Sequence, residues 1–162
     1  MTSRQSISDS TPLIALARIG ELELVRRTLG EVLIPDAVYE EVVEARAEAA
    51  GAREVAEATW VRRVSADPAV VAPLLLLVGR GEAEAIALAQ AHPGSLLLTD
   101  DLKARKVAKS LGVEVQGCLG ILQRAKRRGL ISEIRPLTAR LQSRGWRISE
   151  RELEEFLRHS GE

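Results

Sequence analysis

The stretch from Gly79 to Asp101 restricts the possible fold more than any other part of the chain. It contains an alanine-rich helix, a break at Pro93 and then the apolar run 96–98, which leads into two aspartates. A short strand that is apolar on both faces is typical of a parallel sheet covered by helices. Because such sheets bind ligands beyond the carboxyl ends of their strands, Asp100 and Asp101 are expected at a functional position.

Helix phase separates the two glutamates at the start of this helix. At about 100° per residue, Glu82 shares a face with Ala85 and Ile86, whereas Glu84 lies roughly opposite. Glu82 is therefore expected to point inward, although a carboxylate in a first turn also gains about 0.3–1 kcal/mol from the helix dipole. The sequence leaves two choices open, namely Glu82 or Glu84 and Asp100 or Asp101.

The rest of the chain alternates predicted helices with short strands. Strands are predicted at residues 32–34, 60–64, 96–98 and 113–115, whereas residues 6–8 contain one apolar side chain and show no strand periodicity. Helices are predicted from Pro35 onward and at residues 13–19, 21–29, 44–59, 70–78, 102–111, 117–128, 134–142 and 149–159, the one at 44–59 being exposed. This order indicates an α/β domain at residues 1–130 and a helical extension at residues 131–162 that packs on it.

Two acidic residues outside the central stretch also attract attention. Asp9 is a natural helix N-cap, and the hydroxyl groups of Ser10 and Thr11 after it would orient Asp9 or bind phosphate. Glu41 lies on a mostly apolar helix face together with Val38. Because an unpaired buried carboxylate is costly, Glu41 is expected either to bind a ligand or to lie at the edge of that face.

The composition limits the kind of metal site that the chain can form. One cysteine, Cys118, excludes a disulfide framework and a cysteine-based zinc site, and the two histidines exclude a histidine-rich site. Any metal would be bound by oxygen. No apolar run approaches the roughly 20 residues of a membrane span, and the first ten residues lack the apolar core of a signal peptide, so we expect a cytoplasmic protein.

Charge is distributed unevenly along the chain, although the net charge is zero. Residues 1–101 contain 9 Lys and Arg against 16 Asp and Glu, whereas residues 102–162 contain 14 against 7. Carboxylates that bind a metal beside a basic region are what an enzyme acting on a polyanion needs. The basic residues closest in sequence to the aspartates are Lys103 and Arg105, and a second group ends at Arg127 and Arg128.

Five motifs together resemble the PIN-domain nucleases. They are SDSTPLIAL with Asp9, VLIPDAVYEEV with Glu41, GRGEAEAIALA with Glu82, LLLTDDLKARKVA with Asp100, and GCLGILQRAKRRGLI. Their order over residues 5–135 is similar to that of a prokaryotic family of small PIN-like proteins related to the toxins of toxin–antitoxin pairs. The resemblance implies a three-layer α/β/α sandwich with a central parallel sheet.

The resemblance also implies the chemistry. It implies metal-dependent hydrolysis of RNA, with Mg²⁺ or Mn²⁺ bound by Asp9, Glu41, Glu82 and Asp100, and with Asp101 beside them. RNA contacts are expected from Ser10, Thr11, Lys103, Arg105, Arg127 and Arg128. An antitoxin protein and a second copy of the chain are the expected protein partners.

Other classes of protein fit the sequence less well. A receiver domain would have its aspartate pair after the first strand, and a phosphatase of the haloacid-dehalogenase type would have Asp-x-Asp-x-Thr where this chain has Asp9-Ser10-Thr11. The alternative that stays open is a catalytically inactive PIN-like module that binds nucleic acid or protein. Only four side chains are Phe, Tyr or Trp, which argues against a base-stacking surface.

Overall fold

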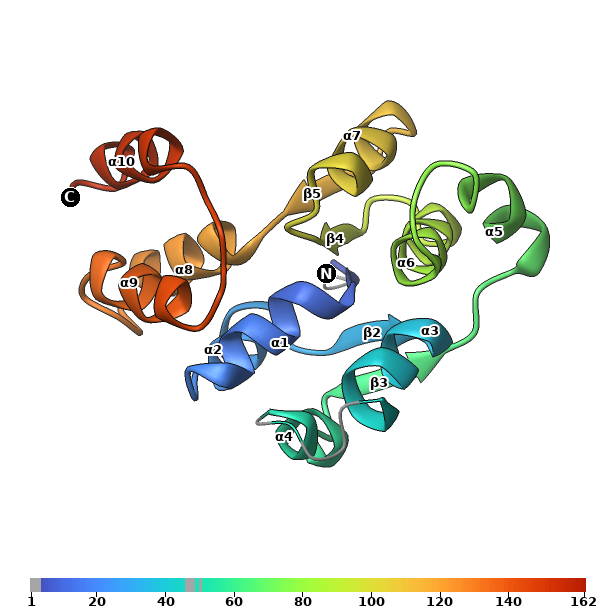
Figure 1. Ribbon diagram of the computed structural model, residues 1–162, viewed down its shortest axis with the longest axis horizontal. Helices are drawn as coiled ribbons and strands as arrows, with labels where there is room; N and C mark the ends of the chain where they lie inside the picture. The colour runs from blue at the N-terminus through green and yellow to red at the C-terminus, as the bar shows by residue number, and fades with distance from the viewer. Residues whose placement is uncertain (1–3, 46–48, 50) are drawn as a thin grey trace.

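A parallel sheet of five strands forms the centre of the computed structural model, which describes residues 4–45, 49 and 51–162 (Figure 1). The strands are β1 (Ser6–Ser8), β2 (Val32–Pro35), β3 (Val61–Val64), β4 (Leu96–Leu98) and β5 (Glu114–Gln116). Their order across the sheet is β3-β2-β1-β4-β5, and every neighbouring pair is parallel. The predicted parallel α/β sheet is therefore confirmed.

Helices cover both faces of this sheet. Their bounds are α1 (Ser10–Arg18), α2 (Glu23–Leu29), α3 (Asp36–Tyr39), η1 (Glu40–Glu44), α4 (Ala52–Glu57), α5 (Pro68–Leu74), α6 (Arg80–Ala91), α7 (Leu102–Ser110), α8 (Cys118–Arg127), α9 (Arg135–Ser143) and α10 (Glu150–His159). Alternate residues of β4 belong to different cores, because successive strand side chains point to opposite faces. Leu96 and Leu98 pack with α1, α2 and α8, whereas Leu97 packs with α5, α6 and α7. The molecule is thus a three-layer α/β/α sandwich.

The central strand β1 is the element that hydrophobic periodicity did not predict. Ser6 and Ser8 are buried together with Ile7, and β1 pairs with β2 on one side and with β4 on the other. Serine fits a strand that is covered on all sides, because its side chain is small and its hydroxyl group finds a local acceptor. The Oγ of Ser8 donates to the backbone oxygen of Asp9 at 2.8 Å.

Two predicted helices differ from the structure. The exposed helix expected at 44–59 is the shorter α4, preceded by the π-helical turn η1, and Ala52 and Val55 of α4 are buried against α1 and η1. Part of that prediction, at residues 46–48 and 50, lies outside the described residues. The apolar helix expected at 70–78 is α5, which ends at Leu74, so Leu75, Leu76 and Leu77 form an exposed turn.

The C-terminal helices pack on the same core as α1 and α8. Leu137 and Leu141 of α9 and Leu157 of α10 belong to the hydrophobic cluster that contains Leu122 of α8. Figure 1 shows α8, α9 and α10 grouped at the end of the molecule opposite to α5. Within the described part of the chain, no helix has the length and apolar character needed to cross a membrane.

Candidate active site

Asp9 lies at the carboxyl end of the central strand and begins α1. Its backbone N–H donates to the oxygen of Leu98 at 3.0 Å, which joins it to the end of β4. Its carboxylate accepts hydrogen bonds from the Thr11 N–H at 3.2 Å and from the Thr99 hydroxyl at 2.5 Å. With a side chain only 3% exposed, Asp9 is a buried acid whose orientation is fixed by both neighbouring segments.

The surroundings of Asp9 oppose its negative charge. Burial is the main cause that raises the pKa of Asp9 to about 8, and the negative charges of Glu82 and Asp100 raise it further. The hydrogen bond from Thr99 acts in the other direction and lowers the pKa. A bound cation would reverse this preference, because it would favour the ionised forms of all three carboxylates.

Asp100 is held at the other side of this site by the start of α8. Its Oδ1 accepts the backbone N–H of Cys118 at 3.0 Å, and it lies so close to Gly117 that a Cβ at that position would collide with it. Its Oδ2 is buried and has no hydrogen-bond partner among the described residues. A buried carboxylate oxygen without a partner is unusual in a protein and is available to a ligand.

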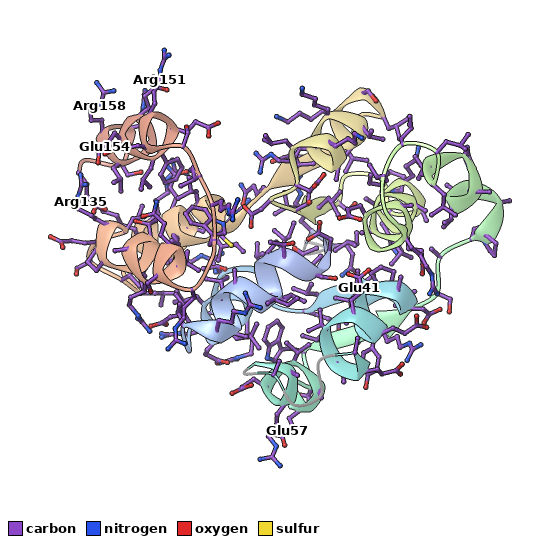
Figure 2. The ribbon with its side chains drawn as sticks, viewed as in Figure 1. Glu41, Glu57, Arg135, Arg151, Glu154 and Arg158 are labelled. Atoms are coloured by element: carbon purple, nitrogen blue, oxygen red, sulfur yellow. The ribbon has the colours of Figure 1, made fainter. Side chains whose placement is uncertain are left out.

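Glycines make room for the two glutamates of the site. A Cβ at Gly81 would lie 2.8 Å from Oε1 of Glu41, and one at Gly79 would lie 2.7 Å from Oε2 of Glu82. Glu41, labelled in Figure 2, comes from the π-helical turn η1, and its Oε2 accepts from the Ser10 hydroxyl at 2.5 Å. The two glycines of the sequence Gly-Arg-Gly-Glu thus leave room for the carboxylate of Glu41 beside α6 and for that of Glu82 at the start of the same helix.

The other two acidic residues have structural contacts instead. A position opposite Glu82 on an amphipathic helix would face solvent. Glu84 is instead buried where α6 packs against α3. Its carboxylate accepts the Ala37 N–H at 3.2 Å and the Arg80 Nε at 2.9 Å. Asp101 is exposed and caps α7 by accepting the Ala104 N–H at 2.8 Å.

The predicted RNA-contacting residues fall into two groups. Ser10, Thr11, Lys103 and Arg105 all lie next to the carboxylates, and the guanidinium of Arg105 donates to the Thr99 oxygen at 3.1 Å. Arg127 and Arg128 are exposed at the opposite end of α8, about 14 Å along the helix from Cys118. The structure therefore brings the first group to the site and leaves the second group at a distance.

The acidic residues suit a divalent cation in their chemistry. Oxygen ligands are those that Mg²⁺ and Mn²⁺ prefer, and Asp100 offers a buried oxygen to which no group in the described part of the chain bonds. Within the described residues, no three His, Cys, Asp or Glu side chains are already gathered as they would be around a metal ion.

Sequence reasoning missed two groups that position the aspartates. Thr99 bonds to Asp9 through its side chain, and the Cys118 N–H bonds to Asp100. Thr99 could have been found, because a polar residue between an apolar strand and an aspartate lies at the same sheet edge. The Cys118 contact joins positions 18 residues apart and depends on the approach of α8 to β4.

The chain belongs to the PIN-domain family, because the family model described as a PIN domain matches residues 5–162. PIN domains are in general nucleases that use divalent metals. The family thus agrees with the acidic site at the carboxyl edge of a parallel sheet. No curated protein matches the chain in a sequence comparison.

Proposed function

We propose that this chain is a Mg²⁺- or Mn²⁺-dependent endoribonuclease with Asp9, Glu41, Glu82 and Asp100 as its metal ligands. The observation that carries the proposal is the burial of Asp9 beside Glu82 and Asp100, which raises the pKa of Asp9 to about 8. A buried acid with only a structural role is usually paired with a cation of the protein, as Glu84 is with Arg80. Asp9 has acidic neighbours instead, which favours a role in binding a cation.

Three of the four carboxylates in this proposal have a supporting group that sets their direction. Thr99 and the Thr11 N–H orient Asp9, Ser10 orients Glu41, and the Cys118 N–H orients Asp100. A divalent cation bound there would supply Lewis acidity that polarises the phosphate and offsets the charge developing in the transition state. Asp101 supports the site indirectly, since it caps α7 and fixes the turn that follows Asp100.

The positive charge beside these carboxylates supports a polyanionic substrate. Lys103 is exposed in the hollow that also contains Glu82 and Asp101, and Arg105 lies against Asp100 and Thr99. Guanidinium and ammonium groups bind phosphate without regard to sequence. Arg127 and Arg128 would then contact phosphates farther along the same strand, and RNA rather than DNA follows from the family resemblance.

An RNA digestion with chelator and metal add-back tests this function. Asp9→Asn and Asp100→Asn should lower Mg²⁺- or Mn²⁺-dependent cleavage by roughly 100-fold or more, because each removes a charged ligand. Glu84→Gln is the matched control for Glu82→Gln: the two residues lie one helix turn apart at most, but only Glu82 adds to the negative field at Asp9. If Asp9→Asn cleaves as well as the wild type, the nuclease activity comes from elsewhere and the chain is an inactive PIN-like binding module.

The resemblance to toxin–antitoxin toxins extends the proposal to the cell. We infer that the chain acts in the cytoplasm and that a separate antitoxin protein inhibits it. Induced expression of the wild type should then stop growth, whereas Asp9→Asn at an equal protein level should not. Equal inhibition of growth by both would argue against toxicity through RNA cleavage.

A further inference from the structure

We propose that the cavity between the C-terminal helices and the end of β5 binds one nucleobase of the RNA beside the cleaved phosphate, with Trp146 as the stacking surface. This inference rests on the proposed ribonuclease function and adds a subsite to it. The cavity has a volume of about 700 Å³, within the range of roughly 300–1,000 Å³ that is usual for ligand pockets.

The position of the cavity links it to the candidate active site. Asp100 and Arg105 line it together with Leu119 and Gly120 of α8, and residues of the segment from Trp146 to Phe156 line it as well. A nucleotide whose phosphate contacts the Asp100 region would therefore have this cavity within reach of its base. No second binding surface is required, because the catalytic carboxylate and the cavity are continuous.

The aromatic side chains are concentrated in this cavity. The chain has four residues of type Phe, Tyr or Trp, and two of them, Trp146 and Phe156, line it. Tyr39 and Trp60 belong to other elements, at the end of α3 and before β3. The small number of aromatics, which argued against a base-stacking surface over the whole molecule, is thus compatible with one stacking position at the site.

The indole of Trp146 is held by packing rather than by a polar contact. Its Nε1 is buried and has no hydrogen-bond partner among the described residues, although buried indole N–H groups usually have one. Trp146 also lines a smaller hollow beside Thr11 and Arg18. Its side chain therefore borders both hollows, and a base in the larger cavity can contact it.

The polar groups around the cavity suit a nucleotide better than an apolar ligand. Arg105 and Arg147 provide positive charge for the phosphates on either side of the base. Gln123 offers an amide, which can both donate to and accept from the edge of a base. Glu152 also lines the cavity, but its carboxylate already accepts from the hydroxyl of Ser149 at 3.0 Å.

Tryptophan fluorescence can measure this binding without any cleavage. Trp60→Phe leaves Trp146 as the single tryptophan of the chain and lies outside the cavity. In chelator, a hexaribonucleotide of uridine or adenosine should quench Trp146, whereas a hexamer of abasic ribose phosphates, which keeps every charge, should not. Equal quenching by the abasic hexamer would show phosphate binding alone and would overturn the proposal. A base-bearing hexamer that does not quench Trp146 would overturn it as well.

A second measurement uses labelled RNA and the affinity of variants. Trp146→Leu should bind the base-bearing hexamer roughly 5- to 100-fold more weakly, the range expected for one lost stacking contact, and Trp146→Phe should bind it within a few fold of the wild type. The affinity for the abasic hexamer should be the same in all variants. An unchanged affinity of Trp146→Leu for the base-bearing hexamer would overturn the subsite.

The two hypotheses fail in different ways. If the wild type cleaves RNA with Mg²⁺ or Mn²⁺ but Trp146 does not distinguish base-bearing from abasic RNA, only the subsite is wrong. If Trp146 distinguishes them but no metal supports cleavage, the ribonuclease function is wrong and the cavity belongs to an RNA-binding module.

Discussion

Asp9 is nearly closed off from water, yet its neighbours are negatively charged. In the protein without metal, this arrangement costs free energy, because the folded chain must either hold a buried charge or protonate an acid that is ionised when unfolded. Thr99 and the Thr11 N–H recover part of that cost by donating to the carboxylate. Asp9 should therefore lower the free energy of unfolding of the metal-free protein.

Asp9→Asn should accordingly stabilise the metal-free protein. Removing the buried acid should raise the free energy of unfolding by about 1–3 kcal/mol, even though the single amide oxygen of asparagine accepts fewer hydrogen bonds than the carboxylate. Thermal unfolding in chelator measures this as a higher Tm. Added Mg²⁺ or Mn²⁺ should then raise the Tm of the wild type and leave that of Asp9→Asn nearly unchanged. A lower Tm for Asp9→Asn in chelator would contradict the electrostatic interpretation.

At the scale of single residues, the sequence separated the candidate ligands from the acids with structural contacts only in part. Helix phase distinguished Glu82 from Glu84, but it treated α6 as a helix with one exposed side. In fact Ala83 to Ala89 are all buried, so Glu84 points into a second packed interface, where Arg80 pairs with it. Phase gives the direction of a side chain, and only the tertiary packing shows what lies in that direction.

At the scale of elements, Glu162 connects α8, α10 and the start of α9. Its carboxylate accepts from Lys126 at 2.9 Å and from the backbone N–H groups of Ile134 and Arg135 at 2.7 and 3.0 Å. Burial by itself would raise the pKa of Glu162, but these hydrogen bonds outweigh it and lower the pKa below 4.5. Glu162 thus caps α9 with a charge that the helix N-terminus favours.

Glu162→Gln should destabilise the fold by about 1–2 kcal/mol at pH 7, because a charged acceptor is replaced by a neutral one. Since the folded pKa of Glu162 is lowered, its contribution is fully present above pH 4.5 and is lost as the pH falls through the folded pKa. Denaturant unfolding of both proteins at pH 7 and at pH 3 measures the difference. The gap should narrow at the lower pH; a gap that stays constant with pH would rule out the charge as its cause.

Sequence patterns predicted a strand correctly where its residues both favour the strand conformation and are buried. Strands β2 and β4 are runs of apolar residues, and their positions were predicted. Strand β1 was missed because its position in the sheet, between two paired neighbours, depends on partners 26 and 90 residues away in sequence. The π-helical turn that carries Glu41 was also missed, since no sequence pattern distinguishes it from an α-helix.

At the scale of the whole molecule, an apolar strip borders the candidate site. Leu75, Leu76 and Leu77 are 48%, 87% and 52% exposed, and the turn 75–78 forms a hollow of about 280 Å³ with Glu82, Asp101 and Lys103. Large exposed apolar side chains that gather in one place usually mark a contact surface. We propose that two copies of the chain form a homodimer through this surface, in line with the family resemblance.

Leu76→Glu should convert this dimer to a monomer, because it places a charge in the apolar contact. Leu111→Glu is the matched control, since Leu111 is exposed as well but follows the C-terminal end of α7, whereas Asp101 and the hollow lie at its N-terminal end. Light scattering at tens of micromolar should report a dimer for the wild type and Leu111→Glu, and a monomer for Leu76→Glu. A monomeric wild type would refute the dimer.

The pairing of β1 with β4 has a consequence for the synthesis of the protein. Asp9 depends on Thr99, which follows it by 90 positions, and Asp100 depends on the N–H of Cys118. On the ribosome, a nascent chain that has exposed only β1, β2 and β3 therefore lacks half of the site. A ribonuclease built in this way would remain inert toward the messenger RNA and ribosomal RNA around it until most of the domain has been translated and has folded.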